Sequence, residues 1–180
     1  MKIVNIYTDG GCSNNQSDIN TGGWGSVLEY NGKTKEIYGG EKNTTNNRME
    51  IFAVLMALKE LKTTDLIINI YSDSSYVINC LKEKWYIKWQ KNGWINSQKK
   101  KVENKDLWEP LISEIQNFNN INFYRAKGHL NLSKNSELEK WHAKLKKING
   151  NDFNYDLFIK VTKMNNLADE LANKGIDENR

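Results

Sequence analysis

The opening stretch of the chain shows a regular pattern of apolar and polar positions. From Ile3 to Thr8 the two kinds of residue alternate, which predicts a half-buried strand. We expect this strand to end in Asp9, because Gly10-Gly11 frees the backbone to turn sharply. A carboxylate at the carboxyl end of an opening strand is well placed to hold a metal ion, although Asp before Gly is also the commonest way to leave a strand. Further carboxylates in similar places decide between these interpretations.

Two more strands are expected directly after the first. Residues 22–30 read as a strand, Asn31-Gly32 is a strong hairpin signal, and residues 33–40 form the returning strand. The intervening residues 13–20 are polar and loop-like. Three consecutive antiparallel strands are therefore predicted to open the domain.

A helix and a central strand follow the hairpin. Asn46 or Asn47 is the expected cap of an apolar helix that ends near Lys62, which places Glu50 in its first turn. Residues 66–72 are more continuously apolar, which indicates a central strand. This strand ends in Asp73, again a carboxylate at the carboxyl end of a strand.

The second half of the chain predicts mostly helices. The pattern is ambiguous over residues 153–161, which fit a strand and a helix equally well. Before that stretch we expect a short helix over 74–81 and a helix through Trp85 and Trp89 that ends at Asn92-Gly93. A helix over 106–118, with Pro110 in or near its first turn, and a strand over 121–127 follow. The last expected helices begin at a capping box over 136–139 and span 164–174, where the final helix carries Asp169 and stops at Gly175.

Composition limits the class of protein. A chain of 180 residues, 38% hydrophobic and with six Trp, suits one globular domain with a real core. The longest apolar run, residues 51–58, is too short to span a bilayer, and Asp9 interrupts any signal-peptide pattern. Cys12 and Cys80 fit no zinc or redox spacing. We therefore expect a cytoplasmic monomer with reduced thiols and no membrane contact.

Charge is concentrated in one segment. Residues 82–105 contain eight Lys and two Glu, more positive charge than the whole chain's net +4, so the rest of the chain is mildly acidic. Lys alternates there with Trp85, Trp89 and Trp94. A basic segment on an acidic body indicates a polyanionic partner.

Four carboxylates make the strongest candidate site: Asp9, Glu50, Asp73 and Asp169. If the two strands that precede Asp9 and Asp73 are neighbours, these carboxylates meet at one edge of the sheet. Such a cluster repels itself unless cations neutralise it, which implies a hard divalent metal. Two ions roughly 4 Å apart activate a water and stabilise a leaving oxygen in phosphoryl transfer. The plain alternative is four unrelated surface acids.

At this point the chain resembles the type 1 ribonuclease H family. Each motif is weak alone, but their order is highly specific. The matching stretches are YTDGGC at 7–12, TTNNRMEIFAVLMAL at 44–58, YSDSSYV at 71–77, the spaced Trp residues of the basic segment, KVENKDLW at 101–108, KGH at 127–129 and NNLADELA at 165–172.

The resemblance implies a ribonuclease H-like α/β fold, a mixed five-stranded sheet flanked by helices. It implies cleavage of the RNA strand of RNA–DNA hybrids with two Mg²⁺, or Mn²⁺ in their place, leaving 5′-phosphate and 3′-hydroxyl ends. The metal ligands would be the four carboxylates above. His129 matches a loop histidine that assists catalysis or product departure, although it is also readable as an ordinary loop residue.

Substrate contacts are implied by the same resemblance. Asn15, Asn46 and Asn47 match positions that contact the minor groove, and Thr45 matches part of a phosphate pocket. Amides and hydroxyls suit sugar and phosphate edges, but capping and turn formation explain these residues too. The basic segment resembles a protrusion that grips the hybrid; packing onto the core is the alternative for its first two Trp. Its candidate contacts are Trp85, Trp89, Trp94, Lys99, Lys100 and Lys101.

The chain also departs from the family pattern. Ser75 and Asn166 replace residues that are larger or acidic in many members, and an atypical insertion spans about 130–163 of the single domain 1–180. The insertion is readable as a cover for the site, an extension of substrate contact or a partner surface. Two rival functions stay open: a module that grips hybrids without cutting them, and another nuclease or DNA strand-transferase on this fold.

Overall fold

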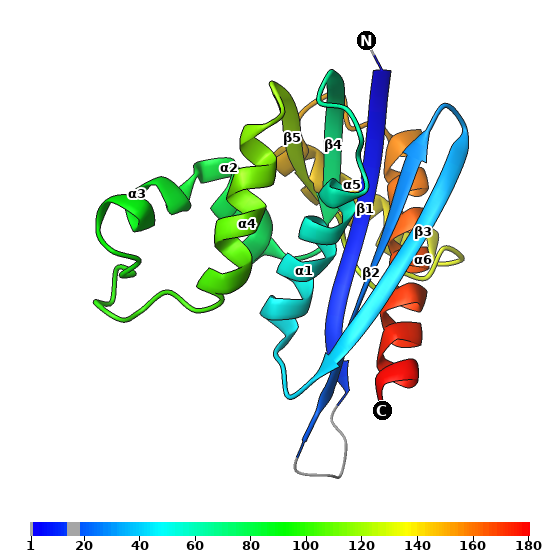
Figure 1. The fold of residues 1–180 in the computed structure, drawn as a ribbon. Helices are drawn as coiled ribbons and strands as arrows, with labels where there is room; N and C mark the ends of the chain where they lie inside the picture. The colour runs from blue at the N-terminus through cyan, green and yellow to red at the C-terminus, as the bar shows by residue number, and fades with distance from the viewer. Residues whose placement is uncertain (1, 14–18) are drawn as a thin grey trace.

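A mixed sheet of five strands forms the centre of the molecule. The computed structural model describes residues 2–13 and 19–180 (Figure 1). The strand order is β3-β2-β1-β4-β5, with β1 in the middle. β1 pairs antiparallel with β2 and parallel with β4, so the expected mixed sheet is confirmed. The strands are Lys2–Ser13 (β1), Thr21–Tyr30 (β2), Lys33–Lys42 (β3), Leu66–Ser72 (β4) and Asn120–Arg125 (β5).

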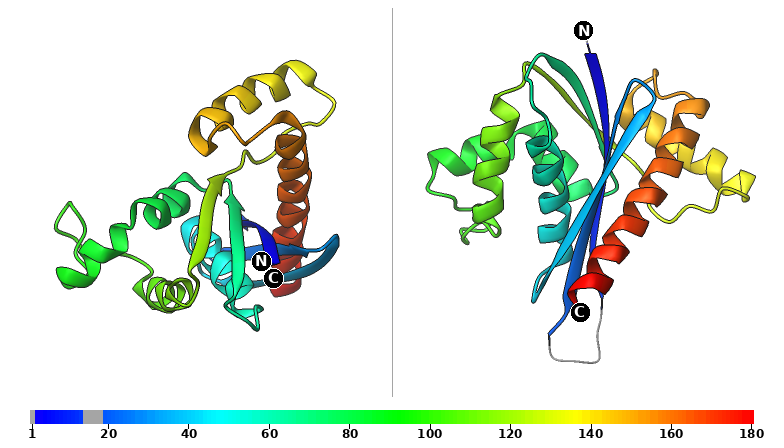
Figure 2. Two further views of the ribbon diagram at one scale, coloured as in Figure 1. Left: turned by 90° about the horizontal axis from the view of Figure 1, so that it is seen from above. Right: turned by 45° about the vertical axis from the view of Figure 1, so that its right-hand side comes forward.

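Helices cover both faces of this sheet. In Figures 1 and 2 the helices α1 to α4 lie on one side, whereas α5 and α6 lie on the other. The α2–α3 arm extends furthest from the sheet. The helices are Asn46–Lys59 (α1), Ser75–Glu83 (α2), Trp85–Lys91 (α3), Lys105–Gln116 (α4), Asn135–Asn149 (α5) and Tyr155–Asn179 (α6). Among the described residues, no helix combines the length and apolar character that crossing a bilayer requires.

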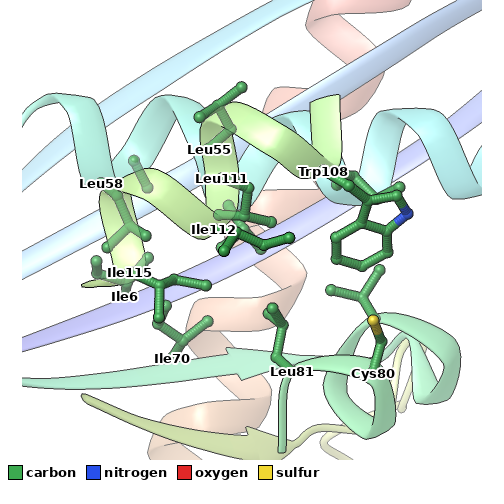
Figure 3. Packing of buried hydrophobic residues seen from close by; sticks show 14 of the residues in the cluster. Ile6, Leu55, Leu58, Ile70, Cys80, Leu81, Trp108, Leu111, Ile112 and Ile115 are labelled. Atoms are coloured by element: carbon green, nitrogen blue, oxygen red, sulfur yellow. The ribbon is translucent and has the colours of Figure 1, made fainter. Parts of the chain in front are cut away.

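The larger core lies between the sheet and α1, α2 and α4. Ile6 and Ile70 from neighbouring strands pack with Leu58 and Leu111, all of them fully buried (Figure 3). Trp108 is also fully buried there, with the ring of Trp89 5.7 Å away in an edge-to-face arrangement. Apolar burial on this scale is the main stabilising contribution to a domain of this size.

A second core covers the opposite face of the sheet. Tyr7, Tyr71 and Tyr124 stack across three strands, with 5.2 Å between successive ring centroids. Burial raises the pKa of Tyr71 to about 12, so the phenol of Tyr71 stays neutral in the physiological range. Leu138 and Leu145 from α5 join this cluster, together with Phe158 from α6. The expected insertion over 130–163 therefore supplies core residues.

The first strand continues beyond the carboxylate. β1 runs to Ser13 and pairs with β2 through Gly10 and Gly11, so the expected end at Asp9 and the sharp turn are wrong. Gly10 has a different function, because a Cβ there would collide with the backbone of Met49 and Glu50. Glycine therefore lets α1 lie directly against β1. The Asn31-Gly32 hairpin is confirmed, with positive φ at both residues.

Several expected helix boundaries are also wrong. Thr45 caps α1 by accepting a hydrogen bond from the Arg48 amide, so neither Asn46 nor Asn47 is the cap and Glu50 lies beyond the first turn. α1 ends at Lys59 instead of near Lys62. Pro110 lies in the interior of α4, past its first turn. α5 begins at Asn135 without a side-chain cap, so the expected capping box is absent.

The ambiguous stretch before Asp169 is helical. Residues 155–161 form the start of α6, which runs unbroken through the expected stop at Gly175 to Asn179. Gly175 stays in the helix because its missing side chain lets α6 approach the backbone of Gly39 in β3. This close contact sets α6 across β1 to β3.

The place of Leu138 in the second core generates a stability prediction. Leu138→Ala leaves a cavity at a side chain that is 2% exposed, and we expect it to lower the free energy of unfolding by about 2–4 kcal/mol. Ile148→Ala on the same helix, at a side chain 46% exposed, serves as the control and should cost less than about 1 kcal/mol. Urea unfolding measures both; equal losses would show that α5 is not part of the core.

Candidate active site

Three carboxylates come together where β1 and β4 stop pairing. Asp9 of β1, Glu50 of α1 and Asp73 after β4 each offer an oxygen, and these oxygens lie within 4.8 Å of one another. The last parallel pair is Thr8 with Ser72, so Asp9 and Asp73 follow it side by side. Glu50 reaches the same place from α1, because Gly10 lets α1 lie directly against β1. The structure thus brings three of the four predicted carboxylates together.

Burial makes this cluster electrostatically unfavourable. Asp9 and Glu50 are only 5% and 7% exposed. Burial, followed by the charge of Asp73, raises the pKa of Asp9 to about 8. Burial and the charge of Asp9 raise the pKa of Glu50 well above its usual range. Hard oxygen donors that hold protons so strongly are a fitting set of ligands for a divalent cation, which would replace those protons.

Asp73 is the most open of the three carboxylates and has its own supports. Burial raises its pKa, but hydrogen bonds with Glu50 and Asp9 and the positive charge of Arg125 act in the opposite direction. The guanidinium of Arg125 also donates to the Asp73 backbone carbonyl over 3.4 Å. Gly128 lies so close to the Asp73 carboxylate that a Cβ would not fit between them. Sequence reasoning missed Arg125, whose only signal was a charged residue at the end of the fifth strand.

Asp169 lies at the rim of the cluster. It comes from α6 and its side chain is 31% exposed. Asp169 contributes to the raised pKa of Asp9, so the two groups are close, yet it lies outside the set of three within 4.8 Å. His129 Nδ1 is 3.9 Å from Asp169 Oδ2, and its side chain is 75% exposed. The imidazole is therefore open to solvent beside Asp169.

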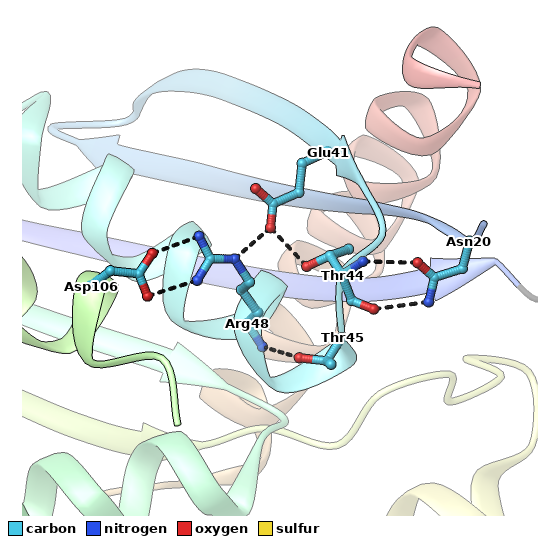
Figure 4. A network of polar contacts seen from close by, with 6 residues as sticks. All are labelled: Asn20, Glu41, Thr44, Thr45, Arg48 and Asp106. Atoms are coloured by element: carbon cyan, nitrogen blue, oxygen red, sulfur yellow. Dashed lines mark hydrogen bonds and ion pairs between the residues drawn. The ribbon is translucent and has the colours of Figure 1, made fainter. Parts of the chain in front are cut away.

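A polar network fixes the loop that leads into α1 (Figure 4). Arg48 donates two hydrogen bonds, of 2.9 and 2.8 Å, to the carboxylate of Asp106 at the start of α4. Its Nε donates to Glu41, which also accepts from the Thr44 hydroxyl. The side chain of Asn20 binds both backbone groups of Thr44. One guanidinium thus joins β3, α1 and α4 beside the site.

The candidate minor-groove residues lie on this fixed loop. Thr45, Asn46 and Asn47 are all exposed. The Thr45 hydroxyl caps α1, and the Asn46 side chain accepts from the Cys12 amide over 2.8 Å. The Asn47 side chain makes none of the hydrogen bonds found among the described residues, which leaves its amide available. Asn15 lies outside the described residues.

The basic segment surrounds a groove of about 670 Å³. Asn47 forms one side of it, and Trp85, Lys100 and Lys101 are among the residues that form the rest. The groove therefore runs from the start of α1 to the basic segment. Trp94 is half-buried and holds the Lys105 ammonium 5.6 Å from its ring centroid, while Lys99 is exposed. Trp89 also borders the groove but is 8% exposed and packs mainly in the core.

Comparison with solved structures defines the class of fold. The solution structure of the PFV RNase H domain has a TM-score of 0.66 and 24% sequence identity, covering 100% of this chain and 98% of that one. LC11-RNase H1, solved in complex with RNA/DNA hybrid, has a TM-score of 0.56 and 21% identity, covering 97% of each chain. The architecture is the ribonuclease H-like fold.

Sequence comparison identifies the family. The family model described as RNase H matches residues 1–177. The Ribonuclease H of Thermoanaerobacter sp. strain X514 is 54% identical over 129 residues, covering 72% of this chain and 80% of that protein. That of Acetivibrio thermocellus is 45% identical over 140 residues, covering 78% and 92%. The chain belongs to the ribonuclease H family, and its motifs are those of type 1 members.

The raised pKa of Asp9 generates a prediction for metal-free protein. The ordinary pKa of Asp is about 3.9, so a folded value of about 8 means that this group favours folding below pH 4 and that the benefit is lost as the pH rises through 8. In EDTA at pH 8, Asp9→Asn should therefore be more stable than wild type, by about 1 kcal/mol or roughly 2–4 °C in Tm.

Thermal unfolding at two pH values checks this sign. At pH 5 wild-type Asp9 is already protonated when folded, so the advantage of Asp9→Asn should be much smaller. Adding Mg²⁺ at pH 8 should raise the Tm of wild type more than that of the variant. A destabilised Asp9→Asn protein in EDTA at pH 8 would contradict the repulsive cluster.

Proposed function

We propose that this protein hydrolyses the RNA strand of RNA–DNA hybrids by two-metal-ion catalysis, leaving 5′-phosphate and 3′-hydroxyl ends. The observation that carries the proposal is the set of three carboxylate oxygens within 4.8 Å in a chain of the ribonuclease H family. The relatives are named Ribonuclease H, and LC11-RNase H1 was solved with an RNA/DNA hybrid. We propose that the chain acts as a single-domain monomer.

The proposed metal ligands are Asp9, Glu50, Asp73 and Asp169. Their oxygen donors and the raised pKa values of the first three suit Mg²⁺ or Mn²⁺ better than soft metals. Bound ions would activate a water and stabilise the charge on the leaving oxygen. The side chain of Asp169 is 31% exposed, so Asp169 suits a ligand that completes the site when substrate arrives.

The chain's own residues then have separate tasks. Asp9, Glu50 and Asp73 would hold the divalent ions that neutralise the reacting phosphate, and the β1–β4 ladder keeps Asp9 and Asp73 in place. The water adds to phosphorus, the bond from phosphorus to O3′ breaks, and O3′ takes up a proton. We assign His129 to proton movement or product departure at this step, because its imidazole is exposed and lies 3.9 Å from Asp169.

Recognition of the hybrid is proposed to use the α1 loop and the basic segment together. Asn15, Asn46 and Asn47 would contact minor-groove edges, where the 2′-hydroxyl distinguishes RNA from DNA, and Thr45 would contact phosphate. The exposed Asn47 amide and the groove beside it support this arrangement. The basic segment would supply backbone contacts through Lys99, Lys100 and Lys101, with flat surface from Trp85 and Trp94 and the rim of Trp89.

One prediction of the proposed function concerns the two acids that flank β4. Asp73→Asn should lower hybrid cleavage in Mg²⁺ by at least about 1,000-fold, because it removes a proposed ligand. Asp65→Asn changes the same residue type at the exposed opposite end of the strand and should leave the rate within about twofold. Cleavage of end-labelled hybrid measures both.

The same assay separates the proposal from its rivals. RNA–RNA and DNA–DNA duplexes should stay intact, and the products should carry 5′-phosphate and 3′-hydroxyl ends. Tight hybrid binding without cutting in Mg²⁺ or Mn²⁺ would favour a binding module. Equal cutting of duplex DNA would favour a different nuclease on this fold.

Another prediction of the proposed function concerns the basic segment. Replacing Lys99, Lys100 and Lys101 with Gln should raise the KM for hybrid by about 10-fold or more. It should also reduce the magnitude of the slope of log affinity against log salt concentration by about 2–3. The kcat should change little, since none of these side chains belongs to the carboxylate cluster. A fall in kcat with unchanged KM would contradict a binding role.

A further inference from the structure

A second group of basic and aromatic side chains lies on α5 and the loop before it. Lys127 Nζ is 4.9 Å from the centroid of the Trp141 ring, and Lys144 Nζ is 4.5 Å from the same centroid. We call Lys127, Trp141 and Lys144 the α5 patch. Two ammonium groups over one indole form a compact positive site, because the ring's electrons attract both cations.

The lysines of the α5 patch form no ion pair within the described part of the chain. No carboxylate there lies within ion-pair distance of Lys127 or Lys144, whereas Lys160 on the neighbouring helix pairs with Glu29 over 2.9 Å. Lys140 and Lys147 on α5 are also exposed. Lys127 and Lys144 thus carry positive charge that no ion pair among the described residues neutralises, although α5 also contains Glu137 and Glu139.

α5 holds this patch in a fixed position. The side-chain amide of Asn149 accepts from the Arg125 amide over 2.9 Å and donates to the Arg125 carbonyl over 2.8 Å, which imitates one more pair of sheet hydrogen bonds at the edge strand. Lys82 of α2 donates to the Ile148 carbonyl. Leu138 and Leu145 anchor the helix in the second core.

The loop that carries Lys127 of the α5 patch continues to the carboxylate cluster. Lys127 directly precedes Gly128, which lies against the Asp73 carboxylate, and the loop continues to Leu130, whose carbonyl accepts from Asn166 of α6. In the right-hand view of Figure 2, α5 and the α3 arm lie on opposite sides of the sheet. The α5 patch and the basic segment therefore lie on opposite sides of the sheet.

We propose that the α5 patch binds the sugar-phosphate backbone of the hybrid on the side of the cut opposite the basic segment. This inference rests on the proposed function. A nucleic-acid duplex extends past the scissile phosphate in both directions, and each phosphate neutralised by Lys adds salt-sensitive affinity. Trp141 holds the two ammonium groups near each other, so they meet the backbone without first losing much side-chain entropy.

Affinity for an uncut hybrid tests the α5 patch. Binding is measured in EDTA by fluorescence anisotropy at several salt concentrations, with full-length protein. Lys144→Gln should weaken binding about 3- to 10-fold and lower the slope of log affinity against log salt by about 1, while Lys144→Arg should restore both. Lys33→Gln is the matched control, since Lys33 is an exposed lysine at the distal hairpin and should change neither quantity.

Cleavage kinetics separate this inference from the proposed function. With Mg²⁺, Lys144→Gln should raise KM by a similar factor and leave kcat unchanged, and shortening the hybrid from the end next to α5 should abolish the difference from wild type. If Lys144→Gln matches Lys33→Gln in affinity and salt slope while wild type cleaves hybrids, the α5 patch is not a contact and the proposed function stands. If wild type neither binds nor cleaves hybrids, both fail.

Discussion

The structure depends on holding three acidic side chains together in a largely buried place. Asp9, Glu50 and Asp73 approach within 4.8 Å. Burial raises the pKa of all three, and repulsion from neighbouring carboxylates raises the pKa of Asp9 and Glu50 further. Such an arrangement opposes folding unless protons or cations neutralise it. The stability that offsets it must come from elsewhere in the fold, and the two cores on either face of the sheet supply it.

The frame around the carboxylates is rigid for identifiable reasons. Parallel pairing of β1 with β4 sets two of the acids side by side, and the missing side chain of Gly10 lets α1 bring the third. Arg48 then links α1 to α4 and β3. α5 contributes twice, because its inner face completes the second core and its outer face carries the α5 patch. The extra segment is thus integrated into the fold.

The sequence was informative where a residue's local pattern and its tertiary place agreed. Alternation and hairpin chemistry predicted the strands, and Asp73 was placed correctly because β4 ends where its apolar run ends. The strand end at Asp9 was wrong, since Gly10 serves helix packing and not a turn. The helix end expected at Gly175 was wrong for a similar reason, because close contact with β3 overrides the tendency of Gly to end a helix. The support from Arg125 to Asp73 and the α5 patch depend on contacts between distant segments, which no local pattern contains.

The central claim is that the carboxylate cluster binds two divalent ions when a hybrid is present. Anomalous scattering from crystals grown with Mn²⁺ and a hybrid carrying a non-hydrolysable scissile linkage tests it most directly. The account predicts two manganese peaks about 4 Å apart, contacting Asp9, Glu50 and Asp73, with the scissile phosphate between them. A hybrid bound at this edge of the sheet with no manganese among the three carboxylates would contradict it.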